Sequence, residues 1–191
     1  MRQEMEIEFK NLLNESEYKK LMERYNTSGS SVWQANDYFD TPAFELRNHG
    51  AALRIREKKT GLVLTLKEPQ DHGLLETHVT LSEQEAEDLF QYGLIHSAEM
   101  NQQLEKFELT TSLEHLGRLE TERFEKQLPS GLLVLDQSTY LGTTDYELEF
   151  EVTDYVAGKL AFEELLQTNE IPVRETKNKI VRFMDRKALT R

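Results

Sequence analysis

The sequence predicts a mainly β protein of the α+β class, in which antiparallel strands form a barrel or a sandwich with helices at its periphery. Three observations lead to this class. About eight segments alternate apolar and polar residues with the period of two that a half-buried strand requires. Turn residues between several of these segments have the spacing of hairpins. The remaining segments begin with helix-capping residues and carry an apolar stripe.

The first expected strand covers residues 4–10 and reads Glu-Met-Glu-Ile-Glu-Phe-Lys. Successive strand residues point to opposite faces, so its charged side chains share one face and its apolar side chains share the other. The charged set is Glu4, Glu6, Glu8 and Lys10. Neighbouring carboxylates on one strand face repel each other. Either solvent or a bound divalent cation must offset that repulsion, and solvent is the ordinary answer for a single strand.

Four further strands and one helix are expected before residue 82. The helix begins where Asn14 or Ser16 can cap it and ends near residues 26–29. The strands carry apolar and aromatic residues in alternation, and they are expected over 31–41, 51–58, 62–67 and 74–81. Turn residues separate them at Pro42, 48–50, 59–61 and 68–73, with 44–47 leading into the second of these turns.

The second half is expected to alternate helices and strands. Ser82 and Glu85 have capping-box spacing and predict a helix to residues 92–93, after which 94–101 form a connection or a short helix. Asp154 opens a helix that ends by Asn169, and a last helix is expected over 175–188. Strands are expected over 107–111, 118–127, 132–139 and 146–153, with a hairpin turn at 129–131.

Composition limits the classes of function. The chain has 191 residues, a net charge of −12 and no cysteine, which excludes disulfides and thiol catalysis. A single domain over 1–191 is expected, in the cytoplasm, with neither a signal peptide nor a membrane span. The acidic balance argues against nucleic acid as a partner, although net charge does not exclude a local basic site. The sequence does not distinguish a monomer from a homodimer.

Several expected strands carry ionisable side chains on a single face. Besides the first strand, the residues concerned are Arg54, Arg56, Lys58, Lys67, Glu76, His78, Arg123, Glu125, Asp136, Glu147, Glu149 and Glu151. If these faces point outward, the barrel has an ordinary apolar interior. If they point inward, the helices pack on the outer apolar face and a polar tunnel results. Its carboxylates would suit Mg²⁺ or Mn²⁺, and its Arg and Lys side chains would suit phosphate.

At these residues the sequence resembles the CYTH family, also called triphosphate tunnel metalloenzymes. The family hallmark E-x-E-x-K is matched by Glu6, Glu8 and Lys10. Further matches follow in the family's order over nearly the whole chain: 36–41, 53–56, 64–67, Glu76, Arg123, Asp136, Glu147, Glu149 and Asn178-Lys179, with Lys177 as a second candidate for the last lysine. The hallmark alone is a weak signal because it is short. The ordered set is a strong one.

The resemblance implies an eight-stranded antiparallel closed β-barrel, a triphosphate tunnel that hydrolyses or cyclises a triphosphate with a divalent cation, Mg²⁺ or Mn²⁺. The residues expected to ligate the metal are Glu6, Glu8, Glu76, Asp136, Glu147 and Glu149. Those expected to bind the triphosphate are Lys10, Arg54, Arg56, Lys67, Arg123 and Lys179. Of these two groups, Glu6, Glu8, Lys10, Arg54, Arg56, Glu147 and Glu149 are expected to be catalytic.

One position departs from the family pattern. Many members have a lysine two residues before Arg123, where this chain has Thr121. Arg118 is a candidate replacement, but its parity puts it on the opposite strand face unless a bulge intervenes. The ordinary alternatives for the expected site residues are a solvated strand face for the carboxylates, cross-strand ion pairs for the arginines and Lys67, and plain solvation for Lys179. The histidines at 49, 72, 78, 96 and 115 lack zinc-site spacing and are expected at the surface or in turns.

Three functions remain open on the sequence. The first is a hydrolase of inorganic triphosphate, which needs only a charged tunnel. The second is an adenylate cyclase or a phosphatase of thiamine triphosphate or a nucleotide, which would need an organic pocket, with Trp33, Tyr38 and Tyr140 as candidates. The third is a module that binds a polyphosphate or a nucleotide without turning it over, because a complete ligand set shows only a capacity to bind.

Overall fold

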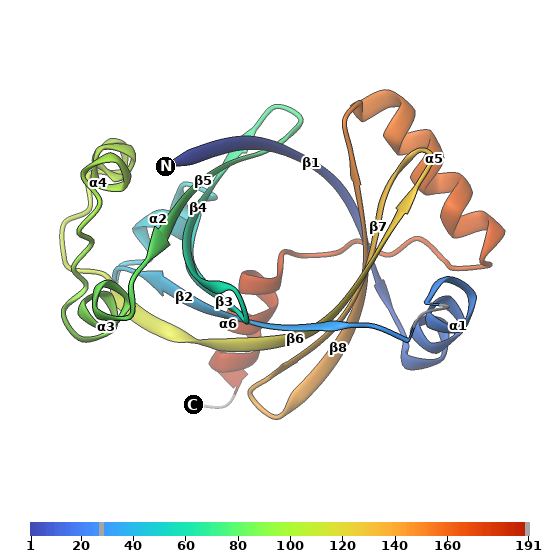
Figure 1. Cartoon of the computed structure of the whole chain (residues 1–191), viewed down its shortest axis with the longest axis horizontal. Coiled ribbons are helices and arrows are strands. Elements are labelled where there is room, and N and C mark those ends of the chain that lie inside the picture. The colour runs from blue at the N-terminus through green and yellow to red at the C-terminus, as the bar shows by residue number, and fades with distance from the viewer. Residues whose placement is uncertain (27–28, 190–191) are drawn as a thin grey trace. The chain divides into compact units, whose positions relative to one another are not determined.

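The computed structural model describes residues 1–26 and 29–189. Eight strands follow one another in the order β1-β5-β4-β3-β2-β6-β7-β8, which closes into a barrel (Figure 1). The strands are β1 Arg2–Leu13, β2 Val32–Asp40, β3 Ala52–Lys58, β4 Gly61–Gln70, β5 Gly73–Leu81, β6 Glu114–Leu128, β7 Gly131–Tyr140 and β8 Thr143–Val152. The predicted eight-stranded closed barrel is therefore confirmed.

Helices occupy the connections between strands and the C-terminal part of the chain. They are α1 Glu15–Tyr25, α2 Glu45–Asn48, α3 Glu83–Tyr92, α4 Ala98–Leu104, α5 Tyr155–Thr168 and α6 Lys179–Leu189, with a 3-10 turn at Glu105–Phe107. The predicted caps are confirmed, since Asn14, Ser82 and Asp154 each accept a hydrogen bond from a first-turn amide. None of the helices in the described ranges has the length and the apolar character that a membrane crossing requires.

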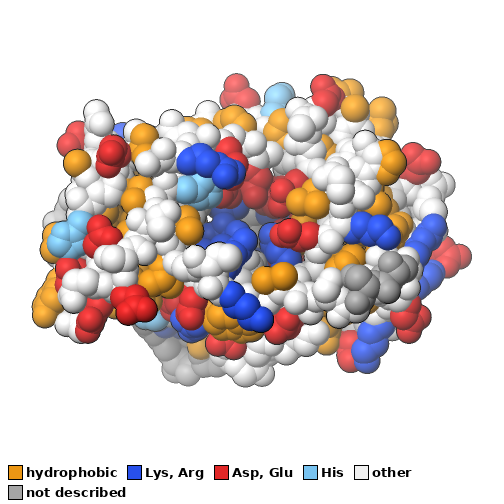
Figure 2. All heavy atoms as spheres, viewed as in Figure 1, with side chains coloured by type: hydrophobic (Ala, Val, Ile, Leu, Met, Phe, Trp, Pro, Cys, Tyr) orange, Lys and Arg blue, Asp and Glu red, His pale blue; other side chains and the backbone are white. Residues whose placement is uncertain are grey.

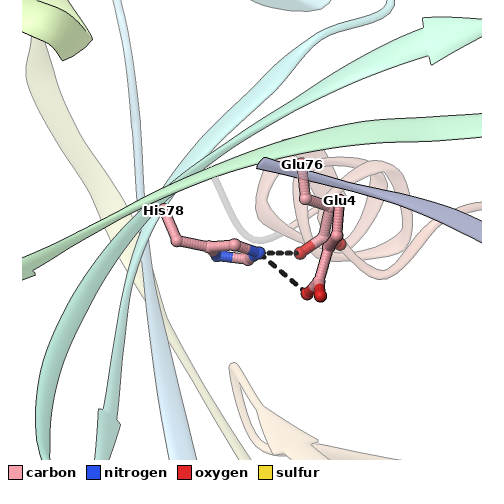
Figure 3. Close-up of side chains that lie close together, drawn as sticks. All are labelled: Glu4, Glu76 and His78. Carbon is pink, nitrogen blue, oxygen red and sulfur yellow. Dashed lines mark hydrogen bonds and ion pairs between the residues drawn. The ribbon is translucent and has the colours of Figure 1, made fainter. Parts of the chain in front are cut away.

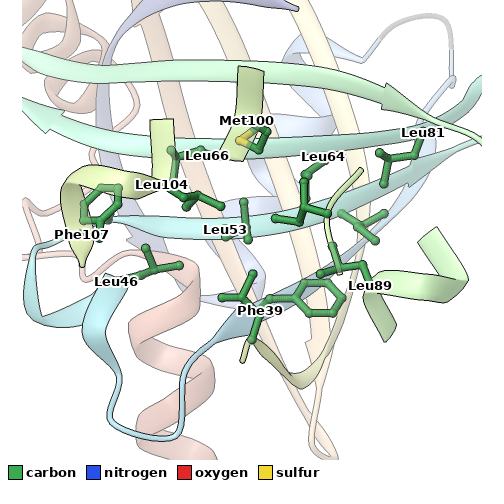
Figure 4. Close-up of a cluster of buried hydrophobic side chains, with 14 of the residues drawn as sticks. Phe39, Leu46, Leu53, Leu64, Leu66, Leu81, Leu89, Met100, Leu104 and Phe107 are labelled. Atoms are coloured by element: carbon green, nitrogen blue, oxygen red, sulfur yellow. The ribbon is translucent and has the colours of Figure 1, made fainter. Parts of the chain in front are cut away.

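The chain forms two compact units. Unit 1 comprises Met1–Met5 and Gln34–Arg118, and unit 2 comprises Glu6–Trp33 and Leu119–Arg191. In unit 1, leucines of β3 and β4 pack against α3 and α4, as Figure 4 shows for Leu53, Leu64 and Leu66 beside Leu89 and Met100. All five of these side chains are 0–1 % exposed, so this layer is the core of the unit.

Unit 2 has a core of the same kind. Leu135 of β7 and Leu148 and Phe150 of β8 pack against Leu21 of α1 and Phe162 of α5. The approach of α5 to the sheet is close: a Cβ added at Gly158 would lie 2.4 Å from Cγ2 of Val152. A glycine is therefore required at this point of α5 if the helix is to lie against β8.

The two cores fix the direction of the charged strand faces. In unit 1 the helix-covered residues Leu53 and Leu64 alternate with Arg54 and Thr65, and in unit 2 Leu148 alternates with the glutamates on either side of it. Because a closed barrel has only two faces and the helices cover the outer one, the charged residues lie on the inner face. Of the two orientations that the residues left open, the chain adopts the inward one, which the resemblance implied.

Four element predictions need correction. Residues 107–111 form no strand: Phe107 ends the 3-10 turn and is buried in the core of unit 1. The turn predicted at 68–73 is shorter, because β4 continues to Gln70, which pairs with Gly73. Residues 45–48 form the short helix α2. The last helix begins at Lys179 rather than at 175. Helix α1 ends at Tyr25, and of its predicted end residues 27 and 28 lie outside the described residues.

Candidate metal and phosphate site

Three buried carboxylates converge on the inner face of unit 2. Asp136 of β7 lies directly opposite Glu147 of β8 in the strand register, and Glu149 is two residues further along the same face. Asp136 and Glu147 are 0 % exposed and Glu149 is 6 % exposed. One oxygen of each lies within 4.8 Å of the other two, as the ligands of a single cation must. These three of the six expected metal ligands therefore lie together, and their role as ligands stays a prediction.

Two cations hold this cluster together. Lys179, at the start of α6, places its Nζ 2.9 Å from Asp136 Oδ2 and 2.5 Å from Glu149 Oε1, and it also bonds Glu147. Arg123 of β6 donates to Asp136 at 2.6 and 2.8 Å and to Glu149 at 2.7 Å. Lys179 is thus the late lysine of the motif series. The second candidate, Lys177, instead forms an exposed pair with Asp185.

The N-terminal motif joins the same face through Lys10. Lys10 lies opposite Glu149 in the register of β1 and β8, and its Nζ is 2.5 Å from Glu8 Oε1 and 3.1 Å from Asn178 Oδ1. Glu8 is itself almost buried, and Glu151 is its cross-strand neighbour. Glu6 is half-buried on β1 and does not belong to the three-carboxylate cluster, so its predicted role as a ligand stays a prediction.

Sequence reasoning missed one cation of this site. Arg182 of α6 donates to Glu147 Oε2 at 3.0 Å and to Asp145 Oδ2 at 2.9 Å, and its side chain is only 10 % exposed. Tyr140 donates to the same oxygen of Asp145 at 2.7 Å. The sequence does contain a signal for Arg182. It follows Lys179 by three residues, and this spacing places both side chains on one side of a helix.

Electrostatic complementarity dominates the ionisation of these groups. Burial alone would raise the pKa of Glu149, but Lys179, Arg123 and Lys10 outweigh it and hold that pKa well below its usual value. Burial likewise opposes ionisation of Asp136, yet Arg123 and Lys179 lower its pKa. In return the carboxylates outweigh burial and hold the pKa of Lys179 well above its usual value. Asp136 and Glu149 are therefore ionised and Lys179 is protonated near neutral pH.

These residues fit a hard divalent cation. Carboxylate oxygens from two adjacent strands are the donors that Mg²⁺ and Mn²⁺ prefer, and the lowered pKa values of Asp136 and Glu149 keep these two groups ready to ligate. The positive charge of Lys179 Nζ lies among them, within hydrogen-bond distance of all three. A cationic group is thus the natural occupant of this position. A divalent ion bound there would compete with the ammonium for the same oxygens.

Unit 1 carries the second set of predicted residues. Lys67 and Glu76 lie opposite each other on β4 and β5 and form an ion pair, with Arg54 Nη2 3.9 Å from the same carboxylate oxygen. Arg56 donates from Nε to Asn36 at 3.0 Å. Arg54, Arg56 and Lys67 therefore share one strand face, as expected. Glu76, however, groups with Glu4 and His78 and not with the cluster of Asp136 (Figure 3).

Two predictions about neighbouring residues are settled by contacts. Thr121 is buried and its hydroxyl lies 3.0 Å from that of Ser138, so this position supplies no charge. Arg118 bonds Asp37 at 2.8 Å and Glu57 at 2.6 Å. Asp37 lies opposite Ile55, which belongs to the helix-covered core. Arg118 therefore makes its contacts on the outer face, as its position in the alternation of the strand predicted.

The expectation for the histidines is wrong at one position. His78 lies within strand β5, and its side chain is only 19 % exposed. Its contacts to Thr65, Glu4 and Glu76 place it on the inner face. Figure 2 shows acidic and basic side chains interspersed over one face of the molecule.

Comparison with known proteins agrees with the fold and with the motifs. The model of the CYTH domain family matches residues 4–184. The chain is 48% identical over 189 residues to a Bacillus subtilis protein named "Putative triphosphatase YjbK", covering 98% of each. A crystal structure from Bacillus halodurans, described as a putative adenylate cyclase, superposes with a TM-score of 0.90 at 40% identity, covering 96% of this chain and 99% of that one.

A second solved structure is informative about activity in a more distant relative. It is that of HpAC1 from Hippeastrum, described as a putative adenylyl cyclase with a dominant triphosphatase activity. The two chains are 25% identical, and the structures superpose with a TM-score of 0.74. The superposition covers 95% of this chain and 96% of HpAC1. With the family match over nearly all of the chain, with a closed barrel and with the motif residues on its inner face, this chain belongs to the CYTH domain family.

Proposed function

We propose that this chain is a divalent-metal-dependent triphosphatase, and that inorganic triphosphate is its substrate. The observation that carries the proposal is the convergence of the buried carboxylates of Asp136, Glu147 and Glu149 on one cationic position. Carboxylates of this kind hold a metal, and the arginines and lysines beside them hold phosphate. The names given to the relatives in Bacillus subtilis and Hippeastrum, both of which mention triphosphatase, support the same reaction class.

The proposal divides the inner-face residues into two roles. Asp136, Glu147 and Glu149 are the main metal ligands, and Glu6, Glu8 and Glu76 remain further candidates. The cationic side chains bind the phosphate oxygens, and the fold holds them in place by ion pairs or, for Arg56, by a hydrogen bond to Asn36. These side chains are Lys10, Arg54, Arg56, Lys67, Arg123 and Lys179, to which the geometry adds Arg182. Phosphoryl transfer needs positioning and charge stabilisation more than a protein nucleophile, which suits a chain without cysteine.

A bound Mg²⁺ or Mn²⁺ would supply positive charge that neutralises phosphate oxygens and acidifies water. The side chains of the chain would hold the ion and the substrate. Asp136, Glu147 and Glu149 would ligate the ion, which would compete with Lys179 for their oxygens. To the extent that the ion replaces it, the ammonium of Lys179 would become available to a phosphate oxygen. Arg123 presents a planar fork that suits two phosphate oxygens at once.

Inorganic triphosphate is preferred over an organic substrate because two of the three aromatic candidates, Tyr38 and Tyr140, are buried. The ring of Tyr140 packs on Phe183 with centroids 5.9 Å apart, and its hydroxyl is bonded to Asp145. Tyr38 is 3 % exposed. A cyclase, or a phosphatase for thiamine triphosphate or a nucleotide, would have to hold its organic group with other residues. A module that binds without turnover is the remaining alternative, and activity measurements decide between them.

The test is a substrate panel with the purified chain. Tripolyphosphate, ATP and thiamine triphosphate are each incubated with Mg²⁺, with Mn²⁺ and with EDTA, and free phosphate and cyclic AMP are measured. Metal-dependent phosphate release that is fastest from tripolyphosphate is the expected result. Cyclic AMP formation from ATP would assign a cyclase instead. Tight binding of tripolyphosphate without any product would overturn catalysis and leave a binding module.

A further inference from the structure

We infer that Glu4, Glu76 and His78 form a second cation site, selective for a transition metal such as Zn²⁺ over Mg²⁺. Glu4 comes from β1, and the other two residues come from β5 with one residue between them (Figure 3). Their side chains point toward one another, and one ligand atom of each lies within 4.8 Å of the other two. This inference does not depend on the proposed triphosphatase activity.

The spacing of the donor atoms is that of a coordination polyhedron. His78 Nε2 lies 3.0 Å from Glu4 Oε1 and 3.3 Å from Glu76 Oε2. With metal–ligand bonds of about 2.1 Å, neighbouring ligands of one ion are about 3.0 Å apart in octahedral geometry and about 3.4 Å apart in tetrahedral geometry. The two distances between the histidine and the carboxylates fall in this range. A metal can therefore replace the proton that these atoms would otherwise share, with little movement.

The imidazole is oriented by a group outside the three ligands. His78 Nδ1 lies 3.0 Å from the hydroxyl of Thr65, which is directly opposite on β4 and is 2 % exposed. With the proton on Nδ1 donated to this hydroxyl, Nε2 carries the lone pair that faces the carboxylates. Metal-binding histidines are commonly fixed by such a hydrogen bond from their other ring nitrogen.

Each carboxylate has one oxygen toward His78 and the other toward a cation. Glu76 directs Oε1 to Lys67, with Arg54 at 3.9 Å, and directs Oε2 to His78. Glu4 directs Oε2 to the exposed Arg2 and Oε1 to His78. Two oxygens and one imidazole nitrogen favour Zn²⁺, Co²⁺ or Mn²⁺, whereas Mg²⁺ prefers an all-oxygen set.

The direct test follows the ring nitrogens of the ¹⁵N-labelled wild-type chain by NMR while Zn²⁺ or Mg²⁺ is added. His78 Nε2 is assigned by comparison with His78→Gln. The expected result is that one equivalent of Zn²⁺ moves His78 Nε2 to the shift of a metal-bound nitrogen, while Mg²⁺ leaves it unchanged. A His78 resonance that does not respond to saturating Zn²⁺ overturns the inference, and this readout needs no variant to bind metal or to turn over substrate.

Affinities measured by competition with a chromogenic chelator complete the test. His78→Gln is expected to lose one Zn²⁺ equivalent or to weaken it at least about tenfold, and Thr65→Val to weaken it about 10- to 100-fold. The matched control is His96→Gln, because His96 also contacts a carboxylate, Asp88 at 2.6 Å, but belongs to no three-ligand group among the described residues. Unchanged stoichiometry and affinity in His78→Gln would show that the three residues form only a hydrogen-bonded cluster.

Discussion

Lys179 Nζ lies 2.5 Å from Glu149 Oε1, so the first residue of the C-terminal helix α6 is bonded to the middle of strand β8. Thirty residues separate the two in the sequence. Both side chains are withdrawn from solvent, and the same ammonium also contacts Asp136 and Glu147. The contact therefore does two things: it fastens a terminal helix to the barrel wall, and it neutralises the carboxylates proposed to hold a metal.

Replacing Glu149 by Gln is expected to lower metal-dependent hydrolysis of tripolyphosphate by about 10²-fold or more, because the amide removes one anionic ligand and leaves the shape unchanged. The rate with saturating Mg²⁺ and the affinity for Mn²⁺ are the measurements. Glu122→Gln is the control, since Glu122 is exposed on strand β6. Equal rates for Glu149→Gln and the wild type would remove Glu149 from the site.

Replacing Lys179 by Met is expected to destabilise the metal-free protein by about 3–5 kcal/mol, because three buried carboxylates lose a shared cation. The same change should make stability depend more strongly on the metal, since Mg²⁺ then no longer competes with the ammonium that contacts all three carboxylates. Urea unfolding with EDTA and with Mg²⁺ measures both effects. Lys177→Met is the control, because Lys177 is exposed. Identical unfolding curves for the Lys179 variant with and without Mg²⁺ would contradict the proposed exchange of ammonium for metal.

The stability of the metal-free protein is expected to fall at both pH extremes. Asp136 and Glu149 have lowered pKa values in the folded state, so their contribution is complete above the unfolded values of about 4 and is lost as the pH falls through the folded ones. Lys179 has a raised pKa, so its contribution is complete below about 10.4 and is lost as the pH rises through the folded value.

Free energies of unfolding between pH 2 and 11, roughly the span of these values, measure this dependence. In Glu149→Gln the acid limb should be shallower than in the wild type, because the variant has one carboxylate fewer to protonate on unfolding. Glu122→Gln should keep the wild-type slope. If the free energy of unfolding of Glu149→Gln fell with acid pH as steeply as that of the wild type, the Glu149 carboxylate would not be held ionised by its neighbours.

Strand alternation was enough to find much of the site from the sequence. Period two places Glu147 and Glu149 on one face, and an isolated carboxylate in the apolar strand of Asp136 is costly to bury without a partner. The sequence does not reveal which residues of different strands lie opposite each other. That Lys10 faces Glu149, or that Glu4 meets His78, depends on the strand register and on the closure of the barrel.

The wrong element boundaries have tertiary causes. Phe107 and the apolar residues after it have strand-like composition, but Phe107 is buried against α4 and Glu108 takes a left-handed conformation with a φ of 49°. Residues 175–178 have a helix-like pattern, yet Thr176 accepts a hydrogen bond from the backbone of Leu12 at 2.8 Å. This contact to β1 keeps the segment out of the helix. Local propensity cannot predict a partner more than a hundred residues away.

Arg182 provides a sharper test of the site, because the same part of the chain offers a matched cation. Arg182→Gln removes the contacts to Glu147 and Asp145, and we expect kcat/KM for tripolyphosphate to fall about 10- to 100-fold, equivalent to about 1.4–2.8 kcal/mol. Arg182→Lys keeps the charge but loses the planar fork, so it should recover only part of the rate.

Lys177→Gln is the matched variant, because it also removes a cation paired with a carboxylate, Asp185 at 2.8 Å, but at an exposed position. Its free energy of unfolding should stay within about 0.5 kcal/mol of that of the wild type, and its kcat/KM for tripolyphosphate should be unchanged. If Arg182 acts only by holding α6 to the barrel, Arg182→Gln and Arg182→Lys would change stability and leave kcat and KM intact. A fall in kcat/KM in the folded Arg182→Gln variant, partly restored in Arg182→Lys, instead requires that Arg182 positions Glu147 or contacts the substrate.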